Sequence, residues 1–182
     1  IFTVAVVVLS TIYPALVATK AAVPSGKRKW SLPQHDGNTM EVLFPFIYHP
    51  KLAVGIVTYI REYFAAFTEA SFGDLIAKEL ERSQTTDSEG RPVYLVKYHL
   101  TLAPFDLGVT QELDFTLAYN DAVQAYQLTM LTTRVSGQDT NWVTTNKPFL
   151  ERMRKYLMRW RNLNTAQHML YVKQAGQFFG EG

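Results

Sequence analysis

The chain has 182 residues, of which 47% are hydrophobic and 13% aromatic, and its formal net charge is +2. This composition excludes a disordered chain, because the apolar fraction is sufficient to build a core. The absence of cysteine excludes a disulfide scaffold, a thiolate zinc site and a cysteine nucleophile. Only 19% of the residues are charged, less than the usual quarter, which favours a chain that lies partly out of water.

The first segment, IFTVAVVVLSTIYPALVAT at residues 1–19, contains no charged side chain. At a rise of about 1.5 Å per residue, a helix of this length approaches the thickness of the hydrocarbon core of a bilayer. Pro14 is tolerated in a membrane helix, with a kink. We therefore expect a single transmembrane helix at 1–19, with a cleaved signal peptide or a buried core helix as the alternatives.

Residues 20–49 predict a basic, proline-rich linker that ends in a strap over the core. Its first part, KAAVPSGKRKW, is basic and rich in turn formers, and places Trp30 where a membrane interface is expected. The later run Val42–Tyr48 is apolar but contains Pro45, which lacks the amide that a central strand must donate. An edge strand and an apolar strap both remain open for this run.

A core helix is predicted over Lys51–Glu69, because its apolar residues recur at helical spacing and Pro50 suits a first turn. After Gly73 the period changes to two. PVYLVKYHLTLA and TQELDFTLAY alternate cleanly as half-buried strands, and AVQAYQLTMLTTRVS follows a short turn at Asn120-Asp121. DLIAKELERSQ fits a strand or a helix, and we favour a strand. The fold class is therefore α+β at 50–145, a helix packed on an antiparallel meander of three or four strands.

The segment 146–182 predicts basic amphipathic helices. A helix from about Lys147 has an apolar stripe composed of Phe149, Met153, Tyr156, Leu157, Trp160 and Leu163. A second, short helix follows Asn164, an acceptable N-cap residue, and a glycine-rich tail ends the chain.

The first of these helices is strongly basic although the whole chain is nearly neutral. Residues 147–163 hold six basic side chains and one acidic one, whereas residues 69–121 hold ten acidic and four basic ones. Four uses fit this asymmetry: an anionic membrane surface, an acidic protein face, a nucleic acid, or solvation alone. A nucleic acid is not expected, since no binding motif is present. The predicted contact residues are Lys27, Arg28, Lys29, Arg152, Arg154, Lys155, Arg159 and Arg161, with Met153, Tyr156 and Trp160 as an apolar anchor.

No catalytic, cofactor or metal site is expected. The four histidines have no metal-binding spacing, and the glycines form no phosphate-binding loop. His35 beside Asp36 is typical of a turn, and His99 is expected on the polar face of a strand. Glu112 and Asp114 share a strand face and could contact a cation or an arginine, but we expect a solvated face, because no histidine or third carboxylate is placed to join them. We therefore expect a protein that is not an enzyme.

The layout is similar to that of the bitopic inner-membrane assembly factors of type IV secretion systems. The matching features are the apolar segment at 1–19, HDGNTMEVLFP before the helix, VTYIREYFAAFTEASF, and the meander. The resemblance implies a cystatin-like or nuclear-transport-factor-like domain, with a long helix clasped by a curved sheet. The basic C-terminal segment departs from that layout, in which further strands are expected, so the analogy concerns the fold.

The expected function is that of a non-catalytic single-span subunit that scaffolds a multi-protein complex in a bacterial inner membrane, such as a secretion or envelope machine. Its expected partners are other subunits, copies of itself and anionic lipid headgroups. The alternative is a module that binds a small molecule or lipid in an apolar pocket lined by Ile60, Phe64, Tyr98 and Phe115. The layout favours an extracytoplasmic domain, whereas the lysines and arginine after the apolar segment favour the cytoplasm.

Overall fold

The computed structural model describes residues 33–71 and 73–180, so the predicted span at 1–19 and the cluster Lys27, Arg28 and Lys29 lie outside the described residues. The strands are β1 (His35–Asp36), β2 (Thr39–Tyr48), β3 (Leu75–Thr86), β4 (Pro92–Leu102), β5 (Thr110–Asn120) and β6 (Ala125–Ser136). The helices are α2 (Pro50–Ala53), α3 (Gly55–Ala65), α4 (Asp139–Arg159) and α5 (Thr165–Gly180), with 3₁₀ turns η1 (Phe105–Leu107) and η2 (Trp160–Asn162).

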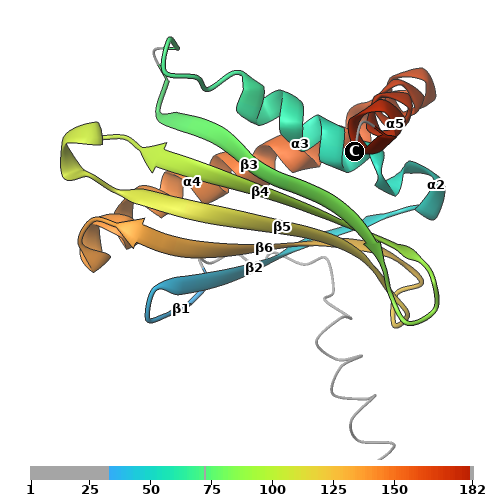
Figure 1. Cartoon of the computed structure of the whole chain (residues 1–182), viewed down its shortest axis with the longest axis horizontal. Helices are drawn as coiled ribbons and strands as arrows, with labels where there is room; N and C mark the ends of the chain where they lie inside the picture. Colours follow the sequence, from blue (N-terminus) through green and yellow to red (C-terminus); the bar gives the residue numbers. More distant parts are fainter. Residues whose placement is uncertain (1–32, 72, 181–182) are drawn as a thin grey trace, which may run out of the picture.

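The strands form one antiparallel sheet in the order β1-β2-β6-β5-β4-β3. Strands β3 to β6 are the predicted meander, and β3 confirms the choice of a strand for DLIAKELERSQ. The sheet is curved, and α3, α4 and α5 cover one of its faces (Figure 1). The α+β class is thus correct, but the expected count of three or four strands is wrong: the sheet of described residues has six.

The additional long strand is β2, which the sequence left open as an edge strand or a strap. Its side chains alternate, with Met40, Val42, Phe44, Phe46 and Tyr48 buried and the residues between them exposed. Pro45 lies within the irregularity of the β2–β6 register between Leu43 and Ile47. The missing amide therefore falls where the ladder is already interrupted, which is how a proline is accommodated at the border of a sheet.

The core helix is shorter and more broken than predicted. It is interrupted at Val54 and ends at Ala65 instead of near Glu69. The early end has a physical reason, because the carbonyl of Phe67 accepts a 2.8 Å hydrogen bond from the Ala77 amide of β3. The segment after the helix therefore follows the edge of the sheet instead of continuing the helical bonds.

Helix α4 begins at Asp139, about two turns before the predicted start near Lys147, so the boundary at 145/146 falls inside one helix. Its first turns are fixed to the sheet through Trp142, whose Nε1 donates to Oε1 of Gln111 at 2.7 Å. Asn146 donates to the same oxygen at 2.8 Å. Pro148, expected near the start of the helix, lies in its interior.

Helix α5 is the predicted second helix, and Asn164 caps it. The Asn164 side chain accepts from the Gln167 amide, and the Gln167 side chain accepts from the Asn164 amide, both at 2.9 Å. This reciprocal pair is a capping box. The helix is not short, because it runs to Gly180, through most of the segment predicted as a glycine-rich tail.

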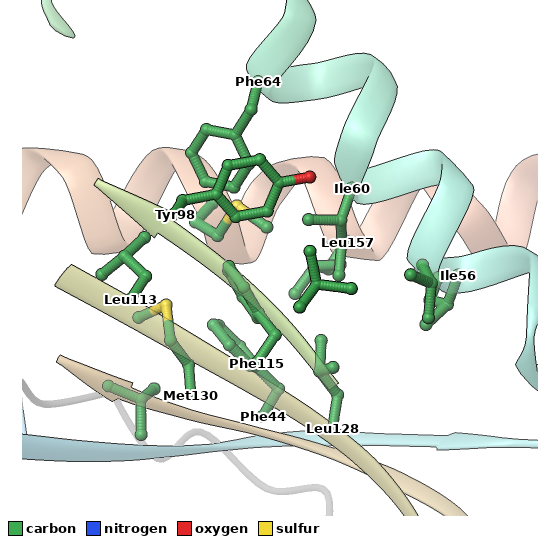
Figure 2. Packing of buried hydrophobic residues seen from close by; sticks show 14 of the residues in the cluster. Phe44, Ile56, Ile60, Phe64, Tyr98, Leu113, Phe115, Leu128, Met130 and Leu157 are labelled. Atoms are coloured by element: carbon green, nitrogen blue, oxygen red, sulfur yellow. The ribbon is translucent and has the colours of Figure 1, made fainter. Parts of the chain in front are cut away.

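One hydrophobic core lies between the helices and the sheet. Figure 2 shows Phe44, Leu113, Phe115, Leu128 and Met130 of the strands facing side chains of α3 and α4. Phe178 of α5 belongs to the same cluster. The predicted C-terminal segment therefore shares its core with the predicted α+β domain.

Candidate functional site: the outer side of helix α4

Helix α4 has two sides of opposite character. Its inner side packs on the sheet and buries Trp142, Phe149, Leu150, Met153 and Leu157 almost completely. This set confirms the predicted apolar stripe and extends it by two turns toward the N-terminus. Because the inner side is held by the core, the outer side is presented on a rigid element.

The outer side of α4 and the following turn η2 carry exposed cations. We call Lys147, Lys155, Arg159 and Arg161 the basic stripe; all four side chains are exposed. Lys155 and Arg159 are four residues apart and therefore lie on one helix face. Met158 lies beside them and is 40% exposed.

None of the four cations of the basic stripe forms an ion pair with a carboxylate of the described residues. Glu151, four residues before Lys155, is exposed and is the only acidic side chain in residues 147–163. The stripe therefore keeps a positive excess that the described part of the chain does not neutralise. Cations near a helix C-terminus also complement its macrodipole, which accounts for part of the preference for basic residues there.

Two other predicted contact residues are placed differently. Arg152 points to the loop before β3 and binds Asp74, with Nη1 2.8 Å from Oδ2. Arg154 is half-buried, and its Nε is shielded from solvent. Both residues therefore lie at the flanks of α4 and not among the exposed cations.

The predicted apolar anchor lies inside the fold. Trp160 is 5% exposed and packs on Gly55, where an added Cβ would lie only 3.0 Å from the indole ring. Tyr156 stacks on Tyr59 at 4.2 Å, and each hydroxyl donates to the backbone carbonyl of the other residue. Burial raises the pKa of Tyr156 above its ordinary value. These aromatic side chains, like Met153, join α4 to α3 and to the core, and are not at the surface of this structure.

The basic stripe does not meet the acidic strand residues of its own sheet. Glu112 and Asp114 alternate with the buried residues of β5, so they lie on the sheet face opposite the helices. Both contact Lys97 of β4, whose Nζ lies 2.8 Å and 3.6 Å from their carboxylates. The hydrogen bond that Lys97 donates to Glu112 and the nearby charge of Asp114 raise the pKa of Lys97. These acids were expected to be solvated; they are partly exposed but also paired with a lysine on the neighbouring strand.

Three of the histidines contact neighbouring groups, and His99 alternates with the buried residues of β4, on the polar face that was expected. His35 lies 3.3 Å from Asp139 and meets the Trp142 ring edge-on. His49 accepts from the Lys51 amide at the start of α2, and His168 packs on Trp160. Within residues 33–71 and 73–180, no group of three His, Asp or Glu side chains is placed to hold a metal ion.

The space around the side chains of the predicted pocket is filled. Ile60, Phe64, Tyr98 and Phe115, the side chains of the predicted pocket, are all buried, and the Phe64 and Tyr98 rings lie 4.5 Å apart (Figure 2). The cavity beside them measures about 10 Å³. A space of that size is at the lower limit for one water molecule, so this conformation has no room there for a small organic ligand.

A polar network under the first turns of α4 was not found from the sequence. Gln111, Thr132 and Asn146 are fully buried and polar, and Gln111 accepts from both Trp142 and Asn146. The only feature of the sequence that indicates this network is Gln111, a polar residue among the inward-facing apolar residues of an alternating strand. The helix that brings Trp142 and Asn146 over that position is distant in sequence, so no local pattern indicates the pairing.

Comparison with known proteins adds no family: no protein-family model matches the chain, and no curated protein matches it. Among the described residues, no helix is both long enough and apolar enough to cross a membrane. The predicted span at 1–19 is outside that search, and it stays a prediction.

Proposed function

We propose that the described domain is a non-catalytic interaction domain, carried by a single-span subunit, that joins a multi-protein membrane complex through the basic stripe of α4 and η2. The observation that supports this most directly is the set of four exposed cations beside exposed Met158, on a helix whose other side belongs to the core. A partner with acidic side chains around an apolar centre would complement this surface.

A protein partner is favoured over a lipid surface by the positions of the aromatic side chains. Interfacial helices use Trp and Tyr as anchors at the level of the headgroups. Trp160 is buried here and Tyr156 is half-buried against Tyr59. A membrane contact of the stripe would therefore rest on charge and Met158 alone, whereas a protein contact needs only charge complementarity and a small apolar centre.

The experiment is co-purification of the tagged full chain from its own cells, comparing wild type with Lys155→Glu/Arg159→Glu. Loss of partner proteins at equal expression is expected, because both substitutions place negative charge against an acidic face. The matched control is Lys78→Glu/Lys173→Glu, which reverses two exposed cations elsewhere and should retain the partners. Wild-type stoichiometry in the stripe variant would contradict the proposal.

Flotation with vesicles of phosphatidylglycerol and phosphatidylcholine separates the lipid alternative. If the stripe variant keeps its protein partners but loses vesicle binding, the stripe serves a membrane surface and the protein contact is wrong. Protease accessibility of a C-terminal epitope in intact spheroplasts, against lysed controls, tests the extracytoplasmic location that the layout favours. Cleavage in intact cells supports that location, and survival until lysis places the domain in the cytoplasm.

A further inference from the structure

Helix α5 has a packed side and an open side. It lies beside α3 at one end of the helical layer (Figure 1). On the packed side, Val172 lies against Gly55, and the Thr58 hydroxyl donates to the Tyr171 carbonyl at 2.8 Å. Phe178 joins the core from this side. The open side carries exposed residues that we call the α5 outer stripe: Ala166, Met169, Leu170, Lys173 and Gly176.

Two adjacent large apolar side chains of the α5 outer stripe are open to solvent. Met169 is 50% exposed and Leu170 is 55% exposed. The stripe residues recur every three or four positions, so they lie on one side of the helix along about 15 Å of its length. A helix that packs one side on a core normally carries polar residues on the other. With apolar side chains on both sides, α5 has the pattern of a helix between two neighbours, of which the described residues supply one.

Gly176 of the stripe has no role in the packing of the described domain. A Cβ added to Gly176 would meet no described atom within 4 Å, whereas one added to Gly55 would lie 3.0 Å from the Trp160 ring. A glycine inside a helix is less favourable than an alanine, because it orders a more flexible backbone. Its advantage is that another backbone can come close at that point. The stripe therefore combines two protruding apolar side chains with a shallow place about two turns further on.

The charges around the stripe favour a partner with acidic side chains. Residues 152–180 contain six basic residues and no acidic one. Helix α2 contacts α5 and adds exposed Lys51, also without an acidic residue. Glu62 of α3 reaches α5 on its packed side, where it accepts from the Tyr171 hydroxyl at 2.8 Å. A second copy of this chain is disfavoured, because a two-fold contact between two such stripes brings Lys173 of one copy toward Lys173 of the other.

A helix fits this surface better than an extended segment. The backbone groups of α5 are bonded within the helix, so its open side offers only side chains to a partner. An extended segment lying there would leave its own amides and carbonyls without partners where it covers the apolar residues. A helix satisfies its own backbone groups and can place an apolar row against the open face of another helix.

We propose that the α5 outer stripe binds an amphipathic helix of a partner protein, with the apolar row of that helix on Met169, Leu170 and Gly176 and a carboxylate of its border at Lys173. The inference goes beyond the function proposed for the basic stripe and does not depend on it. The control pair Lys78→Glu/Lys173→Glu should accordingly keep the partners of the basic stripe and lose this helix alone.

The test begins with the photo-cross-linking residue p-benzoylphenylalanine in place of Leu170, in the full chain and in its own cells. Sequencing of the cross-linked peptides by mass spectrometry is expected to find one segment of another protein, with apolar residues at helical spacing and Asp or Glu beside them. The same residue in place of Ile47, which is 62% exposed on the sheet, is the control and should not capture that segment. Cross-links only to lipid, only to this chain, or only to segments without that pattern would overturn the proposal.

Two variants assign the captured segment to the stripe. Gly176→Leu fills the shallow place and should lower the cross-linking yield about 10-fold, the effect of a misplaced side chain in a close contact. Its melting temperature should not fall, because the added side chain meets open space and leucine favours a helix. Thr144→Leu, which adds leucine at an exposed position of α4, is the matched control and should keep the yield.

Lys173→Glu is the second variant, and it leaves every apolar residue of the stripe in place. It should lower the yield of the same cross-link by a similar factor at low salt, because the captured helix carries carboxylates. Lys173→Gln should have a smaller effect, since it removes attraction without adding repulsion. Wild-type yields in both Gly176→Leu and Lys173→Glu would place the captured segment elsewhere and overturn the proposal.

Discussion

Arg91 and Arg159 differ in whether the fold itself supplies a carboxylate partner for the guanidinium group. Arg91, in the β3–β4 turn, lies 2.7 Å from Asp87 and 2.6 Å from Asp121, and its guanidinium sits 4.3 Å from the Tyr119 centroid. Arg159 is exposed at the end of α4 and has no carboxylate partner among the described residues. A cation that the fold itself binds is expected to act on stability, whereas one that the fold leaves open is available to a partner.

The same contrast separates the two sides of α4. The inner side, with Trp142 and Trp160, is fixed by packing and by buried hydrogen bonds. The outer side carries cations that we expect to contribute little to the stability of the domain. Substitutions on the inner side should therefore lower the free energy of unfolding. Substitutions on the outer side should release the partner and change that free energy only slightly.

The largest loss of stability is expected for Trp160→Ala. This side chain is 5% exposed and packs against Gly55, Tyr59 and Tyr171. Truncating a buried tryptophan costs about 3–5 kcal/mol of unfolding free energy, which urea denaturation would measure. Met158→Ala, two residues away on the exposed side, is the control and should cost about 1 kcal/mol or less. Equal losses would mean that α4 does not pack as described.

The next largest loss is expected for Gln111→Met, which keeps the volume but removes the acceptor for Trp142 and Asn146. Each buried donor left without its acceptor costs about 1–3 kcal/mol. Because Asn146 Nδ2 keeps a second acceptor in the Trp142 carbonyl, the free energy of unfolding should fall by about 2–4 kcal/mol, toward the lower end of the sum for two donors. Gln127→Met, a half-buried glutamine on the neighbouring strand, serves as the control and should change it much less. A neutral result at Gln111 would show that the network adds nothing to stability.

A third prediction concerns pH and the Arg91 cluster. Hydrogen bonds from Arg91 hold the pKa values of Asp87 and Asp121 below the ordinary 3.8. The folded state thus binds fewer protons than the unfolded state. The stabilisation is present above the unfolded pKa and is lost as the pH falls through the folded values. In Arg91→Gln, NMR titration should find both carboxyl pKa values raised toward 3.8, and unchanged values would contradict the pairing.

The smallest stability effect is expected for Lys155→Glu/Arg159→Glu. Exposed substitutions usually change stability by a few tenths of a kcal/mol, and the helix dipole adds a similar amount near the C-terminus of α4. The unfolding free energy should therefore fall by about 1 kcal/mol or less, measured by urea denaturation beside the co-purification test. A loss as large as that of Trp160→Ala would show that the stripe supports the fold and would remove the contrast between the two sides.

Some structural elements of this protein can be predicted from the local sequence pattern alone. Period-two alternation indicates β4, β5 and β6, and the apolar spacing from Phe149 to Trp160 indicates the inner side of α4. These features are local because side-chain direction repeats every two residues in a strand and about every 3.6 in a helix. The excess of cations near the C-terminal end is likewise countable without a structure.

Other features were decided by contacts between distant segments. The pairing of β2 with β6 made a strand of a proline-containing run, and Trp142 on Gln111 placed the start of α4 two turns earlier than the local signal. Trp160 was predicted as a surface anchor, and the packing of α3 and α5 around it placed it inside. Arg61 and Arg82 meet on Phe178 only because three elements converge there. The sequence determines which side chains are apolar or charged, but whether each is buried, paired or left open depends on the neighbours that tertiary packing supplies, because burial and pairing energies depend on distance in space.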